Sequence, residues 1–236
     1  MSITSHPILT QDGSKSIKSD RFGLPYHSEF GAITESMYIY IDHGLKAVSP
    51  KEKTVRIFEM GLGTGLNLAL SIQHRAEHQH LHYECVEAYP LSWPQVQALD
   101  YDQHLSASAY QALKAVHEGP SETPIHVTEE VSVIKHLTQI ETMKLPSDLD
   151  VIYFDAFGPN SQAEPWSKPV LKACFEALKP GGIWVTFSAQ GALKRRLRGI
   201  GFELRIQPGP PGKREMIQAV KQGNKVSGDV SLEAQK

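Results

Sequence analysis

The stretch FEMGLGTGLN, residues 58–67, decides the fold of this chain. An apolar run at residues 55–58 leads into the glycines and an apolar segment at residues 66–72 follows them, so the pattern predicts a strand, a glycine turn and a helix. Glycines at alternate positions permit backbone angles that other residues avoid, and they let a ligand lie against the main chain. The free N–H groups at the start of the helix then face that ligand.

The acidic residues around the turn indicate which ligand it holds. A dinucleotide site has the pattern G-x-G-x-x-G with a pyrophosphate over the helix N-terminus, whereas this chain has E-x-G-x-G-x-G with Glu59 directly before the turn. A carboxylate there repels a diphosphate and suits a cation, such as the amino group of S-adenosylmethionine. Glu87 ends the next predicted strand and can accept hydrogen bonds from both hydroxyls of a ribose. We therefore expect a nucleoside site; a tight turn with a purely structural role is the alternative.

Length, charge and cysteine content limit the classes of protein to which this chain can belong. The 236 residues suffice for one α/β domain with a full core. A net charge of −2 means that any nucleic-acid surface must be local. Cys85 and Cys174 fall in a predicted strand and a predicted helix, which favours reduced core thiols. No stretch approaches the roughly 20 apolar residues of a membrane span, and the N-terminus lacks a secretory pattern, so we expect a cytoplasmic protein.

The middle of the chain alternates strands with helices. We expect a hairpin at residues 8–17 around Asp12-Gly13, and residues 37–41 fit either a helix or a strand. Further strands are expected at 81–87, 125–129, 149–155, 183–187, 202–206 and 216–220, and helices at 66–76, 90–101, 106–117, 131–142, 169–178 and 191–199. This order predicts a seven-stranded, mostly parallel sheet with helices on both faces and a C-terminal antiparallel hairpin. Rossmann-like class I S-adenosylmethionine-dependent methyltransferases resemble this arrangement.

Two carboxylates, Glu129 and Glu130, end the expected strand at 125–129. One of them can accept a hydrogen bond from the exocyclic amine of an adenine; the alternative is that they begin the helix expected at 131–142, where acids complement the dipole. The expected cofactor contacts are Glu59, Gly61, Gly63, Gly65, Asn67, Glu87 and Glu129. Histidines gather at residues 74–82, but no Cys or carboxylate pattern joins them, so we expect no metal.

The apolar strand expected at 149–155 ends on Asp155, and the loop at 156–166 carries two prolines, a Phe and a Trp. Ligands in open α/β sheets lie at the carboxyl ends of strands, near the switch in strand order. We therefore expect Asp155 to face the ligand and its loop to wall a substrate pocket, an ordinary connecting loop being the alternative.

Four pieces of sequence narrow the family. They are YHSEFGAITESMYIYIDHGL at 26–45, FEMGLGTGLNLAL at 58–70, DVIYFDAFGPNSQAEPW at 150–166, and PGGIWVTFSAQGALKRRLRGIGF continuing to PGPPGKREM at 180–216. With these, residues 8 to 220 resemble the tRNA wobble-uridine methyltransferase family that makes 5-methylaminomethyl(-2-thio)uridine, the N-terminal domain of MnmC-type enzymes, in its stand-alone form. We expect an N-terminal extension at 1–45 that caps the site, with a plain packing extension as the alternative, and a methyltransferase domain at 46–220. The composition of residues 221–236 predicts a flexible tail.

The resemblance also implies an activity, which is methyl transfer from S-adenosylmethionine to the aminomethyl nitrogen on carbon 5 of the wobble uridine. The bifunctional relatives carry a second, flavin-dependent domain, for which we expect no room after residue 220, so we expect no flavin. The implied partner is the anticodon region of tRNA, bound by a monomer. The rivals are a methyltransferase for a small-molecule or protein amine and a non-catalytic binding module.

Specific residues receive roles under this interpretation. Asp155 is the expected catalytic residue, which holds the acceptor amine, orients its lone pair and receives its proton. The expected substrate pocket comprises Tyr26, His27, Glu35, Phe157, Pro159 and Trp166, because flipped bases are held against aromatic faces. The candidates for tRNA phosphate contacts are Lys194, Arg195, Arg196, Arg198, Lys213 and Arg214. For each of these basic residues a solvated surface position is the alternative.

Overall fold

The computed structural model describes residues 6–19 and 21–223; most of the tail expected at 221–236 lies outside this part. Its strands are β1 His6–Leu9, β2 Lys15–Lys18, β3 Thr54–Met60, β4 His80–Val86, β5 Ile125–His126, β6 Val131–His136, β7 Leu149–Phe154, β8 Leu178–Thr186, β9 Phe202–Pro208 and β10 Glu215–Lys221. Its α-helices are α1 Ala32–Ser36, α2 Leu66–His74, α3 Trp93–Gln97, α4 Ala107–Glu118, α5 Lys168–Ala177 and α6 Gly191–Ile200. Its shorter helical turns are η1 Met37–Asp42, η2 Leu45–Ala47, η3 Tyr101–Gln103, η4 Ile140–Thr142 and η5 Glu164–Trp166.

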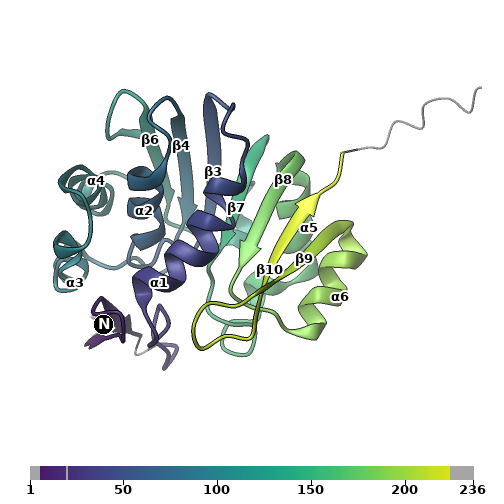
Figure 1. Cartoon of the computed structure of the whole chain (residues 1–236), viewed down its shortest axis with the longest axis horizontal. Coiled ribbons are helices and arrows are strands. Elements are labelled where there is room, and N and C mark those ends of the chain that lie inside the picture. Colours follow the sequence, from purple (N-terminus) through teal and green to yellow (C-terminus); the bar gives the residue numbers. More distant parts are fainter. Residues whose placement is uncertain (1–5, 20, 224–236) are drawn as a thin grey trace, which may run out of the picture.

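One large sheet carries the fold (Figure 1), with the strand order β5-β6-β4-β3-β7-β8-β10-β9. Strands β3, β4, β6, β7 and β8 run parallel, and β10 pairs antiparallel with both β8 and β9. The mostly parallel sheet with a C-terminal antiparallel hairpin is thus confirmed. The sheet has eight strands and not seven, because β6 forms where a helix was expected, and the expected strand at 125–129 remains as the two-residue β5, antiparallel to β6.

The two faces of the sheet build two separate hydrophobic cores. Side chains alternate along a strand, so Ile57 of β3 lies in the core under α2, α4 and η1, whereas Phe58 lies in the core under α5 and α6. Both side chains are fully buried. Free Cys85 and Cys174 are buried in the respective cores, so the prediction of reduced core thiols is confirmed.

One predicted helix is wrong, since residues 131–136 form β6. The segment alternates fully buried and half-buried side chains, with Val131 and Val133 inward, which is the two-residue period of a strand. The expected strand at 125–129 shrinks to β5. Glu129 and Glu130 therefore precede β6, at the opposite end from the carboxyl ends of the parallel strands.

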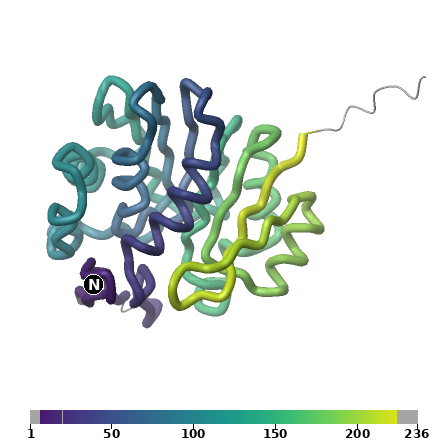
Figure 2. Tube along the Cα trace, viewed as in Figure 1, coloured from purple at the N-terminus to yellow at the C-terminus, as the bar shows by residue number. Residues whose placement is uncertain are grey.

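The N-terminal segment is built into the domain. The hairpin around Asp12-Gly13 is confirmed by the antiparallel pairing of β1 with β2. Residues 37–41 are helical, and Ile39 and Ile41 are fully buried in the core beneath β3. Figure 2 shows this purple segment beside the yellow β9–β10 loop, and Tyr38 Oη donates a hydrogen bond to Pro208 O at 3.0 Å. No helix in the described part of the chain is both long and apolar enough to cross a membrane.

Candidate functional site

The carboxyl ends of four parallel strands meet at one edge of the sheet. Backbone hydrogen bonds continue past the strands there, from Asp155 N to Met60 O at 3.0 Å and from Gly61 N to Val86 O at 3.0 Å. The strand order turns between β3 and β7, because the chain proceeds from β3 to β4 on one side and from β7 to β8 on the other. This edge is the topological switch point at which open α/β sheets bind ligands.

The glycine turn between β3 and α2 needs its glycines for two different reasons. Gly61, Gly63 and Gly65 all have positive φ, which disfavours other residues. A Cβ on Gly61 would meet Asp155 O at 2.8 Å, and one on Gly63 would meet the Tyr26 ring at 3.0 Å. Gly61 and Gly63 line a cavity, whereas Gly65 packs against α4. Gly65, an expected cofactor contact, thus shapes the turn without lining the cavity.

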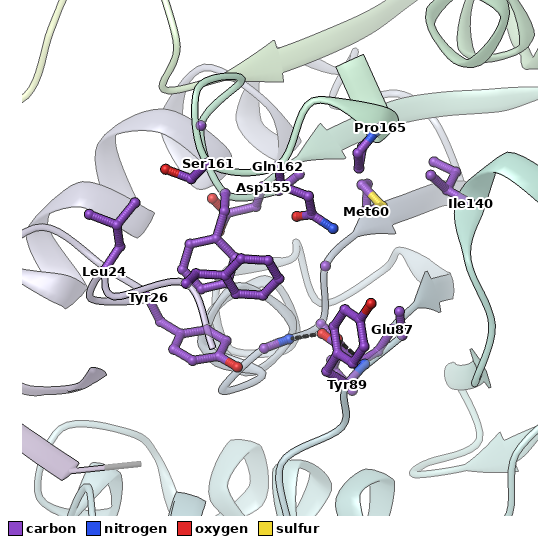
Figure 3. A pocket seen from close by; sticks show the side chains of 18 of the residues that line it. Leu24, Tyr26, Met60, Glu87, Tyr89, Ile140, Asp155, Ser161, Gln162 and Pro165 are labelled. Carbon is purple, nitrogen blue, oxygen red and sulfur yellow. Dashed lines mark hydrogen bonds between the residues drawn. The ribbon is translucent and has the colours of Figure 1, made fainter. Parts of the chain in front are cut away.

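A cavity of about 610 Å³ lies above this edge (Figure 3), which is a typical volume for a small-molecule site. Its floor is the glycine turn. One wall comes from the ends of β4 and β6, at residues 86–89 and 138–141, and the other from the loop after β7, at residues 155–165. Residues 21–28 of the N-terminal segment cover it. The described geometry therefore joins the N-terminal segment to the strand ends around one cavity.

Glu87 is held rigidly at the end of β4. Its two carboxylate oxygens accept backbone N–H groups, from Gly63 at 2.8 Å and from Tyr89 at 2.8 Å. Burial raises the pKa of Glu87, and the backbone hydrogen bonds oppose that rise. The side chain lines the cavity, so its remaining lone pairs can accept hydrogen bonds from adjacent hydroxyls of a ribose.

An apolar slot beside Glu87 suits a flat base. Met60, Val86 and Ile140 line it, and Thr138 and Gln139 add polar groups at its rim. The residues after β6 were missed in the sequence, because that strand was mistaken for a helix. Glu129, the expected adenine contact, does not line the cavity, since it precedes β6 and lies exposed at the other end of that strand.

Glu59 and Asn67 lie beneath the cavity and not in its wall. Glu59 is fully buried, and its carboxylate accepts Tyr83 Oη at 2.8 Å and Asn67 Nδ2 at 2.8 Å. Neither residue lines the cavity. The structure therefore shows no direct access of Glu59 to the cavity, because its side chain, like that of Ile57 two residues earlier, points below the glycine turn.

Asp155 follows β7 and faces the cavity with both oxygens fixed. Tyr40 Oη donates to Oδ1 at 2.7 Å, and Asn67 Nδ2 donates to Oδ2 at 2.8 Å. Burial raises the pKa of Asp155, and nearby His27 is the largest influence that opposes the rise. A carboxylate with a raised pKa is a better proton acceptor than an exposed one, as a general base requires. Tyr40 was missed in the sequence, where residues 37–41 looked like a plain apolar run.

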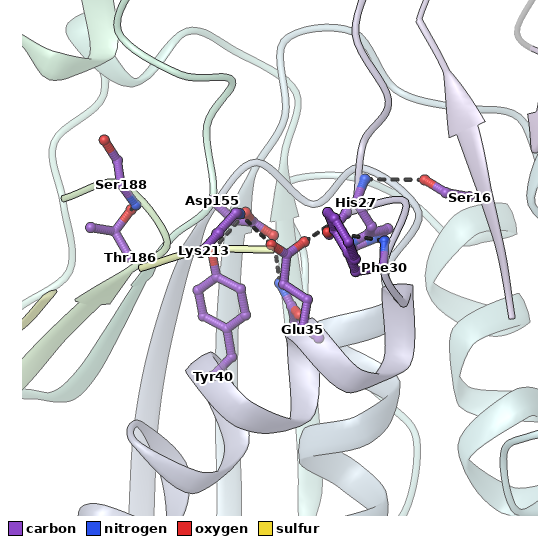
Figure 4. Close-up of polar contacts among 11 residues, drawn as sticks. Ser16, His27, Phe30, Glu35, Tyr40, Asp155, Thr186, Ser188 and Lys213 are labelled. Atoms are coloured by element: carbon purple, nitrogen blue, oxygen red, sulfur yellow. Dashed lines mark hydrogen bonds and ion pairs between the residues drawn. The ribbon is translucent and has the colours of Figure 1, made fainter. Parts of the chain in front are cut away.

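Three residues of the N-terminal segment reach the cavity as expected, namely Tyr26, His27 and Glu35. His27 Nε2 lies 2.9 Å from Thr64 Oγ1 of the glycine turn, and burial lowers the pKa of His27. Glu35 accepts Ser28 N at 2.8 Å and forms an ion pair with Lys213 (Figure 4). The N-terminal segment thus contacts both the glycine turn and the loop between β9 and β10.

The loop after β7 contributes one aromatic side chain to the cavity. Phe157 stacks on Phe22, with ring centroids 4.3 Å apart, and meets the edge of Tyr26 at 5.0 Å. Trp166 is 1% exposed and donates Nε1 to Phe157 O at 2.8 Å, so it anchors the loop from within the core. Trp166 and Pro159, both expected in the pocket, do not line the cavity.

The basic candidates fall into two groups. Lys194 is paired with Glu215, Arg196 donates to Trp166 O, and Lys213 faces the cavity, where its Nζ lies 4.0 Å from the Phe187 ring centroid. The others are exposed, namely Arg195, Arg198 and Arg214. Within residues 6–19 and 21–223, no group of three or more His, Cys, Asp or Glu side chains is arranged to hold a metal.

Comparison with curated proteins finds relatives of this chain. A protein of Cupriavidus metallidurans named tRNA 5-methylaminomethyl-2-thiouridine biosynthesis bifunctional protein MnmC is 29% identical over 227 residues, covering 91% of this chain and 34% of that protein. The chain thus spans about a third of the length of the curated relatives it matches.

Solved structures share the architecture. The crystal structure of MNMC2 from Aquifex aeolicus matches with a TM-score of 0.74 at 25% identity, covering 94% of this chain and 72% of that one. A spermidine synthase in complex with the transition state analogue AdoDATO matches with a TM-score of 0.60 at 14% identity, covering 94% and 71%, which shows a shared fold alone. The family model described as S-adenosyl-L-methionine-dependent methyltransferase matches residues 100–222, more than half of the chain. The chain belongs to this family of S-adenosyl-L-methionine-dependent methyltransferases.

Proposed function

We propose that this chain methylates the 5-aminomethyl nitrogen of the wobble uridine, with or without 2-thiolation, in tRNA. The observation that carries the proposal is Asp155, which faces the cavity together with the apolar residues beside Glu87 and the aromatic ring of Phe157. The MnmC-named relatives, which match 91% of this chain in the first case, support the choice of substrate. We also propose that the reaction needs neither flavin nor metal and takes place in the cytoplasm.

The slot between β4 and β6 fits the cofactor. Glu87 is oriented by backbone N–H groups toward the place of a ribose, and a Cβ on Gly61 would close the space beside Asp155. Ile140 and Val86 supply apolar faces for an adenine. When bound, S-adenosylmethionine supplies an electrophilic methyl group on a positively charged sulfur.

The acceptor side is bounded by aromatic rings and acids. Phe157 and Phe22 are stacked on each other, so a uracil pulled from its stack can lie against the outer side of this pair. Asp155 can accept a hydrogen bond from the aminomethyl nitrogen, orient its lone pair and take its proton. Because Tyr40 and Asn67 fix both oxygens of this carboxylate, it holds the amine in one direction.

A local basic surface would hold the tRNA backbone despite the overall charge of −2. Arg195 and Arg198 are exposed on α6, and Arg214 is exposed in the loop between β9 and β10. The same loop carries Lys213, which lines the cavity. These exposed guanidinium groups can contact phosphates while the base enters the cavity.

The test is methylation of defined tRNA by the purified chain. The substrate is tRNA carrying 5-aminomethyluridine at the wobble position, with S-adenosylmethionine labelled in its methyl group, followed by mass spectrometry of the nucleosides. We expect labelled 5-methylaminomethyluridine, and none from tRNA with an unmodified wobble uridine. Methylation of free amines or of proteins, with the aminomethyl tRNA left unchanged, would refute the proposal. Addition of EDTA should leave the rate unaltered. A protein preparation that shows no flavin absorbance should be fully active.

A further inference from the structure

One aromatic ring of the N-terminal segment is exposed to solvent outside the cavity. Phe30 lies in the loop before α1 (Figure 4) and is 45% exposed, whereas Phe22 and Tyr26 of the same segment are half-buried and line the cavity. Phe22 and Tyr26 both pack on Phe157, but Phe30 takes part in none of the ring contacts among the described residues. The Phe30 ring is therefore available to a partner outside the chain.

This ring is seated on Gly212, in the loop between β9 and β10. A Cβ added to Gly212 would meet Phe30 Cδ2 at 2.1 Å, Cε2 at 2.2 Å and Cγ at 2.8 Å. These distances place the added atom over the face of the ring, because an atom beside the ring edge would be much farther from Cγ. Gly212 also has a positive φ of 81°, which disfavours other residues. The loop thus covers one face of the ring, and the exposed area lies mainly on the opposite face.

The backbone that carries Phe30 is held in place by hydrogen bonds. Phe30 N donates to Ser28 Oγ at 3.2 Å, and Ser28 N donates to the Glu35 carboxylate of α1 at 2.8 Å. On the other side, Gln11 N in the turn between β1 and β2 donates to Glu29 O at 2.9 Å. The ring is therefore preorganised, which reduces the conformational entropy lost when a flat partner stacks on it.

The ring stands at the mouth of the cavity. Ser28, two residues before Phe30, lines the cavity, and so does Lys213, which follows Gly212. Phe30 itself is not among the lining residues. Arg214 is exposed in the same loop. An open aromatic face therefore lies just outside the acceptor side, beside a loop that carries two cations.

These surroundings suit a nucleobase better than a protein surface. Glu29 and Arg214, close to the two sides of the contact along the chain, are exposed and charged, so the ring is not part of a broad apolar patch of the kind that protein partners cover. Single-stranded bases stack on individual aromatic faces beside cationic groups. A base drawn into the cavity leaves its neighbour in the strand without a stacking partner. An aromatic face at the mouth can replace that partner.

We propose that Phe30 is a stacking platform for a base adjacent to the wobble uridine, so that the site holds two neighbouring nucleotides, one in the cavity and one at its mouth. The identity of the strand rests on the proposed function. The stack itself is a binding contact, so it can be measured without methyl transfer.

A double-mutant cycle between protein and RNA tests the stack. The RNA is an anticodon stem-loop with 5-aminomethyluridine at the wobble position, either intact or abasic at the nucleotide on its 5′ or its 3′ side. Fluorescence anisotropy gives the affinities. The wild type should bind one of the two abasic RNAs about tenfold more weakly than the intact RNA, and Phe30→Ala should bind the intact RNA about tenfold more weakly than the wild type does. Phe30→Ala should distinguish the intact RNA from that abasic RNA by less than about twofold, because both changes remove the same contact.

Three further variants separate stacking from packing. Phe30→Tyr keeps a ring face and should bind the intact RNA within about twofold of the wild type, whereas Phe30→Leu covers Gly212 without a ring and should resemble Phe30→Ala. Leu137→Ala is the matched control, because Leu137 is 44% exposed, follows β6 and does not line the cavity. Every variant should bind S-adenosylhomocysteine as the wild type does.

The outcomes distinguish the stacking role from the proposed function. Equal affinity of the wild type for the intact and both abasic RNAs would overturn the stacking role, and this comparison does not depend on the folding of a variant. An equal loss from the abasic change in the wild type and in Phe30→Ala would overturn it as well, because the two sites would then be independent. Coupling without methylation would end the proposed function alone, and methylation without coupling would end the stacking role alone. A wild type that does not bind the intact stem-loop would end both.

Discussion

The carboxylate of Glu87 accepts the backbone N–H of Gly63 at 2.8 Å, so the acid that ends β4 is fastened to the glycine turn that follows β3. Two neighbouring strands thereby hold one rigid corner, at which we propose that the ribose binds. Such a corner is preorganised, which reduces the conformational entropy that a nucleoside would lose on binding.

Replacing Glu87 with Ala should weaken cofactor binding by about tenfold to a hundredfold, because hydrogen bonds to a charged group contribute about 1.5–3 kcal/mol. Calorimetric titration with S-adenosylhomocysteine measures the change. Glu129→Gln is the matched control, since Glu129 is exposed and outside the cavity. Equal affinity of Glu87→Ala and the wild type would mean that the ribose is bound elsewhere.

Replacing Asp155 with Asn should leave cofactor binding nearly intact and slow methyl transfer by about 10²–10⁴-fold, the usual contribution of a positioned general base. Single-turnover assays with aminomethyl tRNA measure the chemical step directly. Because burial raises the pKa of Asp155, the wild-type rate should fall as the pH drops through that pKa and the carboxylate gains a proton. Wild-type turnover by the Asn variant would remove Asp155 from the mechanism.

Replacing Lys213 with Met should destabilise the protein by about 2–3 kcal/mol, because the buried Glu35 would lose its cation. The figure is below that for a fully buried pair, since the Lys213 side chain is 27% exposed. Urea denaturation measures it. The double variant Glu35→Gln with Lys213→Met should recover part of the loss, and a purely additive result would show that the two side chains are not coupled.

The matched control for that pair is Lys46→Met. Lys46 pairs with Asp42 one helical turn away, and both side chains are about half exposed, so its loss should cost less than about 0.5 kcal/mol.

Replacing Arg195, Arg198 and Arg214 together with Ala should weaken tRNA binding and flatten its salt dependence. Each lost phosphate contact should reduce the slope of log K against log salt by about 0.7–0.9. Fluorescence anisotropy over a range of salt concentrations measures the slope. The control is Lys51→Ala, because Lys51 is exposed and precedes the amino end of β3, away from the cavity. An unchanged slope in the triple variant would place the tRNA on another surface.

Replacing Glu59 with Gln should alter the pH dependence of stability. Burial raises the pKa of Glu59 well above its ordinary 4.5. Between 4.5 and that raised value the folded wild type keeps a proton that the unfolded chain releases, so its free energy of unfolding falls as pH rises, by up to about 1.4 kcal/mol per unit. The Glu59→Gln protein has no such proton to release, so its free energy of unfolding should fall less than that of the wild type as the pH rises above 4.5. Parallel stability curves from denaturation at each pH would contradict the prediction.

The sequence was sufficient for the parts of the fold with strong local signals. Positive-φ glycines between an apolar strand and an apolar helix specify the turn at residues 61–65. An apolar strand followed by Asp155 indicates a polar side chain at a strand end, which the switch point then turns toward the cavity. Both inferences rest on short-range patterns, and the structure places both features at the same sheet edge.

The sequence was insufficient where the outcome depends on distant packing. β6 has only six residues, and the two acids before it resemble the first turn of a helix, so its strand period was overlooked. A carboxylate before a glycine turn has the same sequence pattern whether it faces a ligand or the core. Glu59 faces the core because of its place in the alternation of side chains along β3 and because Tyr83 on the neighbouring strand donates a hydrogen bond to it. Likewise, only tertiary contact shows that Tyr40 reaches Asp155.

The contact between Lys213 and Glu35 has a consequence for biosynthesis. The ribose corner is complete once β3 and β4 have joined, but the acceptor side also requires the loop between β9 and β10, which is made some 120 residues later. A nascent chain that has reached residue 141 would therefore contain the residues that line the proposed cofactor slot before Lys213 is made. Since Lys213 and Glu35 both line the cavity, we expect the acceptor side to be complete only when the β9–β10 hairpin has docked.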